Sequence, residues 1–139
     1  METILAPSSR TSHDPHPRTR LRWTGRILSG LIVAFLAFDA AMKLVAIAPV
    51  VEATTRLGYA VSTIRPMGVV LLLATVLYAV PRTAVLGALL TTAYLGGATA
   101  TLVRAGDPSW FPIAMGVLLW ASLMMRQPRL RALLLPVSA

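Results

Sequence analysis

The chain has 139 residues, of which 56% are hydrophobic and only 13% are charged, and its mean hydropathy is +0.72. A soluble domain of this length buries only about two-thirds of its surface, so it cannot hide so many apolar side chains from water. The composition therefore excludes an ordinary soluble protein and indicates that apolar residues face lipid or a partner. The chain contains no cysteine, which excludes a disulfide framework, a thiolate metal site and an intrinsic dithiol redox couple.

The formal net charge is +8, and the basic residues are mostly arginines that cluster toward the two termini. A nucleic-acid-binding protein would gather such charges on a folded basic face, so we expect no nucleic-acid partner. Attraction to the anionic head groups of membrane lipids explains this distribution better.

Residues 1–22 are rich in Ser, Thr, Pro and Arg and have no apolar periodicity, which predicts a disordered basic cytoplasmic tail. The apolar run that follows is too long for the core of a secretory signal peptide, and no cleavage pattern of small residues ends it. His13, Asp14 and His16 lie in this tail, where we expect solvated side chains and no metal site.

Four apolar segments follow, each near the length that crosses about 30 Å of hydrocarbon. They cover about residues 26–51, 65–80, 83–103 and 109–125. We therefore predict an all-α integral membrane protein, a bundle of four transmembrane helices within residues 23–126. We predict that residues 127–139 form a basic cytoplasmic C-terminal tail.

Local residues explain the breaks between these segments. Pro66 suits the first turn of the second segment, and Thr83 is a candidate N-cap for the third. Asp107 or Ser109 is a candidate N-cap for the fourth. Residues 52–64 are compatible either with a short amphipathic helix at the membrane surface or with an irregular loop.

The arginines predict the orientation of the bundle. With four spans, nine arginines lie on the side that holds both termini and three lie on the other side. Because cytoplasmic loops are enriched in Lys and Arg, we expect both termini in the cytoplasm. Four aromatic residues near the predicted boundaries are expected at the membrane interfaces: Trp23, Tyr59, Tyr78 and Trp110.

An acid and a base four residues apart are the strongest functional signal. Asp39 and Lys43 share one helix face, near the middle of the apolar stretch from Ile27 to about Val51. At the centre of a membrane each ionisable group costs about 2.5–3.5 kcal/mol on insertion scales. Such groups usually face the interior of a bundle or a water-filled cavity, so the sequence predicts a buried polar site.

The pair permits two interpretations. It is either a self-neutralising ion pair with a structural role, or a site in which Asp39 exchanges a proton or anchors a lipophilic ligand while Lys43 tunes its charge. Phe35, about one turn earlier, is a candidate for the apolar part of the site, although packing or lipid contact also explains it. Glu52 is either solvated at the outer interface or paired with Arg56.

The third segment is crowded with small residues. One row repeats every four positions: Ala88, Thr92, Gly96 and Ala100. Such a row permits the close approach of another helix, within the bundle or in a homo-oligomer. Thr91 and Tyr94 are candidates for supplying hydroxyl groups to a ligand at Asp39. No predicted span contains histidine, and no phosphate-binding loop, Ser/His/Asp set or HExxH pattern occurs.

Three stretches of sequence carry a family resemblance. They are FLAFDAAMKL at 35–44, LYAVPRTAVLGALLTTAYLGGATATLVRAGDP at 77–108 and GVLLWASLMMRQPRLRALLLP at 116–136. They resemble the DoxX-like family of small bacterial membrane proteins, over nearly everything after residue 25. The resemblance implies four transmembrane helices in the bacterial cytoplasmic (inner) membrane. By analogy it also implies a role beside membrane oxidoreductases and quinone-linked electron transfer.

Two positions depart from the family pattern. Relatives often carry an acid in the second helix where this chain has Leu71, and a histidine after the GGAxAT string where it has Leu102. If those polar groups form a site in relatives, this chain keeps only the half at Asp39 and Lys43. The departure favours an accessory subunit over an enzyme.

Three functions therefore remain open. The first is a non-catalytic or accessory membrane subunit that binds a lipophile such as a quinone at Asp39 and Lys43, or anchors a membrane or cytoplasmic redox partner through its basic ends. The second is a membrane enzyme that isomerises a lipophilic substrate or opens an epoxide, with catalytic Asp39 assisted by Lys43. The third is a small transporter or channel, for which the spans offer little polar lining. Apart from such a bound quinone or lipophile, we expect no cofactor.

Overall fold

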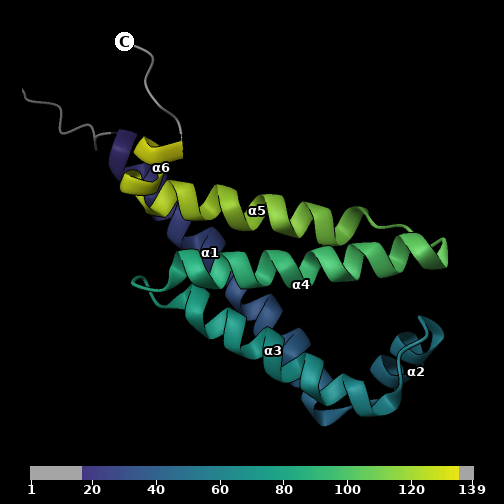
Figure 1. Cartoon of the computed structure of the whole chain (residues 1–139). Coiled ribbons are helices and arrows are strands. Elements are labelled where there is room, and N and C mark those ends of the chain that lie inside the picture. Colours follow the sequence, from purple (N-terminus) through teal and green to yellow (C-terminus); the bar gives the residue numbers. More distant parts are fainter. Residues whose placement is uncertain (1–16, 135–139) are drawn as a thin grey trace, which may run out of the picture.

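The computed structural model describes residues 17–134, and these residues form six helices and no strand (Figure 1). Four long helices make an antiparallel bundle: α1 (Pro17–Val45), α3 (Val61–Ala79), α4 (Ala84–Ala105) and α5 (Trp110–Arg126). Two short helices accompany them: α2 (Ala48–Arg56) and α6 (Pro128–Leu134). The predicted all-α four-helix bundle is confirmed.

Each long helix packs against two others: α1 and α4 both contact α3 and α5. The start of α1, the α3–α4 turn and the end of α5 lie at one end of the bundle, which we call the terminal end. The α2 segment and the α4–α5 turn lie at the opposite end, which we call the distal end (Figure 1). The four helices thus share one core along their length.

Three helical segments are long and apolar enough to cross a membrane: residues 20–45 of α1, α3 and α4. Helix α5 is also apolar, and its 17 residues extend about 26 Å, close to the thickness of the hydrocarbon layer. Large apolar side chains on the outside of the bundle are more than half exposed, as lipid-facing residues would be: Leu31, Leu73, Leu86 and Val117.

Helix α1 starts earlier than expected. Residues 17–22 belong to this helix, whereas the sequence predicted a disordered tail through residue 22. Residues 1–16, which include the His13, Asp14 and His16 group, lie outside the described residues. At the other end of the chain, α6 occupies residues 128–134 of the predicted C-terminal tail, and residues 135–139 also lie outside the described part.

Helix α1 also ends earlier than expected. It ends at Val45 rather than near Val51, because Ala46 adopts a left-handed backbone conformation with φ of 55°. Helix α2 then begins with Pro49 in its first turn, where proline is well tolerated. The segment 52–64, for which the sequence left two options, contains the end of α2, a short connection and the start of α3.

Among residues 17–134, none of the three predicted N-cap residues caps its helix with its side chain. Thr83 precedes α4, but its hydroxyl donates a hydrogen bond to the carbonyl oxygen of Leu77 (2.8 Å) and does not cap the helix. Ser109 precedes α5 without a side-chain capping bond in the described structure. Asp107 forms an ion pair with Arg56 (2.9 Å) and thereby ties the α4–α5 turn to the end of α2.

Close helix approaches at glycine hold the terminal end together. A side-chain carbon at Gly87 of α4 would lie within 2.6 Å of the backbone of Leu77 and would overlap that of Tyr78. A side-chain carbon at Gly25 of α1 would lie 2.6 Å from Cβ of Met125 on α5. Both approaches therefore require glycine.

A buried hydrogen-bond cluster joins three helices near the same end. The hydroxyl of Tyr78 on α3 lies 2.6 Å from the hydroxyl of Ser122 on α5 and 3.2 Å from that of Ser29 on α1. Arg126 donates a hydrogen bond to the Tyr78 carbonyl oxygen (3.0 Å), and its guanidinium lies 4.8 Å from the centre of the Tyr78 ring. Tyr78, which was expected at a membrane interface, is instead fully buried, because its hydroxyl finds partners on two neighbouring helices.

The small-residue row on α4 is only partly packed within the chain. Ala88 is buried in the core, but Thr92, Gly96 and Ala100 line a groove of about 780 Å³ between α4 and α5. Trp120 on α5 crosses this groove and donates its indole N–H to the Thr92 hydroxyl (2.9 Å). The close contact of α4 at Gly87 therefore lies beside the predicted row, whereas Gly96 within the row has no such contact with a described atom.

Gly87→Ala is expected to destabilise the bundle, because the added methyl group would overlap the backbone of α3. Overpacking of this kind typically costs about 1–3 kcal/mol in the free energy of unfolding. Thermal unfolding of the purified chain in detergent, followed by circular dichroism, measures the effect. Gly96→Ala is the matched control, since a methyl group there meets no described atom within 4 Å. Equal stability of the two variants would contradict the contact at Gly87.

Candidate functional site

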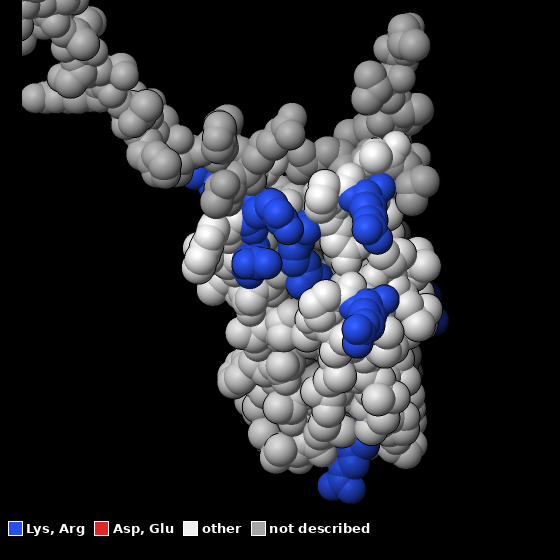
Figure 2. Space-filling model, turned by 90° about the vertical axis from the view of Figure 1, so that its left-hand side faces the viewer, with Lys and Arg blue, Asp and Glu red and all other residues white. Residues whose placement is uncertain are grey.

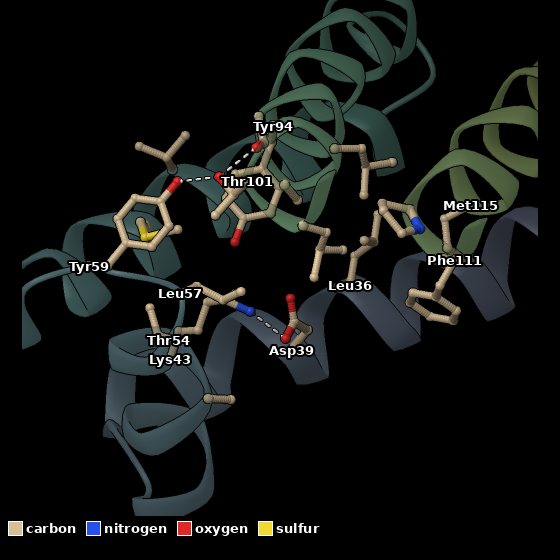
Figure 3. A pocket seen from close by; sticks show the side chains of 18 of the residues that line it. Leu36, Asp39, Lys43, Thr54, Leu57, Tyr59, Tyr94, Thr101, Phe111 and Met115 are labelled. Atoms are coloured by element: carbon tan, nitrogen blue, oxygen red, sulfur yellow. Dashed lines mark hydrogen bonds and ion pairs between the residues drawn. The ribbon is translucent and has the colours of Figure 1, made fainter. Parts of the chain in front are cut away.

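A cavity of about 570 Å³ lies in the distal half of the bundle, between the four long helices and α2 (Figure 3). Cavities of about 300–1,000 Å³ are typical of small-molecule sites. Most of its lining is apolar, and a few polar side chains are gathered near α2. This combination is suited to a largely apolar molecule that carries a small polar group.

The cavity exists because the helices separate toward the distal end. Helices α3 and α4 meet at their turn and diverge toward α2 (Figure 1). In the distal half of α4, a side-chain carbon at Gly97 would meet no described atom within 4 Å, in contrast to Gly87. Helices α1 and α3 stay close, because a side-chain carbon at Gly68 would lie 3.0 Å from the Ala40 carbonyl oxygen. The space therefore opens on the α4 side.

An ion pair lines one wall of the cavity. Lys43 Nζ donates a hydrogen bond to Asp39 Oδ1 (2.5 Å), with both residues on α1 at the predicted spacing (Figure 3). Their side chains are 14% and 28% exposed, respectively, so both are largely withdrawn from the surroundings. Because α1 ends at Val45, Lys43 lies in its last turn. The pair is thus nearer the distal end of the bundle than the central position that the sequence indicated.

Hydroxyl groups from other elements face the same space. Tyr94 on α4, the helix diagonal to α1, lines the cavity and lies within the electrostatic range of Asp39. Tyr59, in the connection before α3, has its hydroxyl 2.8 Å from the hydroxyl of Thr101 (Figure 3). Thr101 in turn donates to the carbonyl oxygen of Gly97 (2.9 Å). These groups give the cavity hydrogen-bonding capacity opposite the ion pair.

Aromatic side chains close the cavity between α1 and α5. Phe35 on α1 and Phe111 on α5 meet edge to face, with ring centres 5.6 Å apart. Leu36 and Met115 extend this apolar wall (Figure 3). The part of the cavity farther from Lys43 is accordingly hydrophobic.

Side chains also close the distal end of the cavity. The Arg56–Asp107 ion pair joins α2 to the α4–α5 turn, and Arg104 donates to the carbonyl oxygen of Leu57 (3.4 Å). Arg56 thus binds Asp107 rather than Glu52, which is exposed. These contacts hold α2 and the following connection over the cavity.

Four of the five side chains predicted for a ligand site line this cavity: Phe35, Asp39, Lys43 and Tyr94. The fifth, Thr91, is fully buried in α4 and does not line it, and its hydroxyl has no hydrogen-bond partner among the described residues. The sequence predicted Tyr59 at a membrane interface and did not single out Thr101, but both line the cavity. Thr101 follows Tyr94 by two helical turns, so helical periodicity alone would have found it.

The two leucines that depart from the family pattern have different surroundings. Leu102 lines the cavity, near the end of α4. Leu71 is fully buried in the core on α3. The cavity thus has an apolar side chain at one position where a polar group was expected. Within the described residues, no three His, Cys, Asp or Glu side chains are grouped closely enough to hold a metal ion.

The family model described as DoxX-like matches residues 27–124, a range that includes every residue lining the cavity. The chain belongs to the DoxX-like family. The resemblance predicted from its sequence is confirmed, and with the apolar helices it identifies a multi-pass integral membrane protein. Comparisons with curated proteins and with solved structures give no match.

Removing one partner of the ion pair is expected to destabilise this DoxX-like protein more than removing both. Lys43→Met leaves the Asp39 carboxylate partly buried without its partner, whereas Asp39→Asn with Lys43→Met leaves no charge. A double-mutant cycle on detergent unfolding should give a coupling energy of about 1–3 kcal/mol. The exposed pair provides the control: the same cycle with Arg56→Met and Asp107→Asn should give less than about 1 kcal/mol. Additive effects at Asp39 and Lys43 would contradict a coupled pair.

Proposed function

We propose that this DoxX-like protein is a non-catalytic membrane subunit that binds a neutral lipophile, with the polar head of the ligand beside Asp39 and Lys43. The observation that carries the proposal is an ion pair on the wall of a mostly apolar cavity of about 570 Å³. The opposite charges of the pair cancel. A charged ligand would introduce an uncompensated charge in this apolar space, so the cavity favours a ligand without net charge.

The polar groups of the cavity suit a ligand with a carbonyl or hydroxyl oxygen. Lys43 has three N–H donors and uses one on Asp39, so two remain for a ligand oxygen. The Tyr94 hydroxyl, which makes no hydrogen bond within the described chain, provides another donor. A quinone carries carbonyl acceptors on an apolar ring, and we propose a quinone as the representative ligand.

The terminal end supports a cytoplasmic position for both termini in a bacterial inner membrane. Arginine side chains gather over this end, and among the described residues no Asp or Glu is visible on the same face (Figure 2). Basic residues are enriched on the cytoplasmic side of membrane proteins and attract anionic lipid head groups. The same surface is suited to anchoring a redox partner with an acidic face.

A membrane enzyme is the second candidate, favoured by the presence of Asp39, Lys43 and Tyr94 on one cavity. These side chains offer both an acid and a base, which isomerisation or epoxide opening of a lipophilic substrate requires. Turnover of a lipophilic epoxide or unsaturated ketone that is lost in Asp39→Asn would establish this alternative. Binding without turnover supports the non-catalytic subunit.

Native mass spectrometry of the chain in lipid nanodiscs, titrated with menaquinone, tests the proposal. We expect one bound quinone per chain. The combined change of Asp39→Asn and Lys43→Met should weaken binding at least tenfold, because the head group loses its charged donors. Tyr94→Phe should weaken it about threefold to tenfold, in line with the loss of one hydrogen bond.

Thr91→Val is the matched control, because this residue lies on the same helix but does not line the cavity. It should bind menaquinone as the wild-type chain does. A wild-type chain that retains no quinone, or affinities that are unchanged in the Asp39 and Lys43 variants, would refute the proposal.

A further inference from the structure

The rim of the cavity between α3 and α4 is exposed. Seven residues that line the cavity are exposed on the surface of the bundle. Three of them are Phe35, Ala53 and Phe111. The other four flank the gap between α3 and α4: Pro66 and Val70 on α3, and Ala93 and Gly97 on α4. Val70, for example, is 53% exposed. In the gap between α3 and α4, a side-chain carbon at Gly97 would meet no described atom within 4 Å, so this gap is an opening, and we call its four residues the lateral portal.

Helical geometry locates the portal between these two helices. Val70 lies two turns before Leu77, whose backbone contacts α4 at Gly87, so Val70 is on the α4-facing side of α3. On α4, Gly96 lines the groove shared with α5. Gly97 is rotated by about 100° from Gly96 and lines the cavity instead. Both helices thus present their portal residues to the gap between them.

The remaining sides of the cavity are closed by packed side chains. The approach at Gly68 closes the α1–α3 side. On the α1–α5 side the exposed rings of Phe35 and Phe111 contact each other and close the gap. Leu95 and Pro112 separate the cavity from the groove between α4 and α5, since both residues line both spaces. The Arg56–Asp107 pair and the Tyr59–Thr101 contact cover the distal end.

The portal lies on an apolar part of the bundle surface. Its four residues carry no charge and no side-chain hydrogen-bonding group, and Ala93 and Gly97 project almost no side chain into the gap. Helices α3 and α4, which flank the portal, are each long and apolar enough to span a membrane. The opening therefore meets the hydrocarbon of the bilayer rather than water.

We infer that the ligand reaches the cavity from within the bilayer through the lateral portal, and that it is a single-tailed neutral lipid whose hydrocarbon tail lies between α3 and α4. The inference rests on the proposed function, which supplies a head group bound at Asp39 and Lys43. A tail in this gap stays in contact with lipid chains while the head is enclosed. A phospholipid would have to bring its charged phosphate past an apolar rim, at a large desolvation cost.

Gly97→Leu tests the portal, because the leucine side chain would fill the gap without displacing any described atom near its Cβ. Two probes are titrated into nanodiscs with the wild-type and variant chains: menaquinone, which has a long isoprenoid tail, and menadione, which has the same ring without the tail. We expect Gly97→Leu to weaken menaquinone binding at least tenfold and menadione binding less than threefold. Native mass spectrometry gives the bound fractions.

Gly96→Leu is the matched control. It adds the same side chain at the neighbouring position, where there is equally no described atom within 4 Å, but in the other groove. It should leave the affinity for both probes within twofold of the wild type, and both variants should unfold at similar temperatures.

Each other outcome has a defined meaning. If Gly97→Leu binds menaquinone as tightly as the wild type does, or if Gly96→Leu loses as much affinity, the portal is refuted while the proposed function stands. A wild-type chain that binds menadione but not menaquinone also refutes the portal, and indicates access from the distal end. A wild-type chain that binds neither probe refutes the proposed function, and the portal inference with it.

Discussion

The contact between α3 and α4 at Gly87 constrains the whole bundle. With no side chain at this position, the two backbones touch beside their turn, and the approach at Gly25 brings α1 equally close to α5. Gly96 and Gly97 have no comparable neighbours, so α4 is not drawn inward along its distal half. Helices that are close at one end and separated at the other leave a space between them, and the cavity follows from where the glycines make contact.

The ion pair is compatible with a membrane because it borders this space. Asp39 and Lys43 neutralise each other, and the cavity lets their remaining polar atoms face hydroxyl groups rather than hydrocarbon. The last turn of α1 also favours a cation, since the helix dipole is negative there, and Lys43 occupies that turn. The stability of the pair and its position on the cavity wall therefore have the same structural origin.

Features that depend on local sequence were predictable, and features that depend on distant residues were not. The hydropathy of the sequence predicted the four apolar helices, and the i,i+4 spacing predicted the contact between Asp39 and Lys43. The core role of Tyr78 depends on Ser29 and Ser122, which are 49 and 44 residues away in the chain. Helical spacing placed Thr91 near Tyr94, but only the packing of α4 decides which of the two faces the cavity. The early end of α1 depends on the conformation of Ala46, for which alanine gives no signal.

Leu95 and Pro112 form a wall one residue thick between two hollow regions, the cavity around Asp39 and the groove beside Trp120. A smaller side chain at Leu95 would join these regions into one passage beneath α4. The size of the molecule that fits inside could then change without any change in the helices or in the charged pair. A single substitution at this wall would thus enlarge the space beside Asp39 while the four-helix scaffold stays the same.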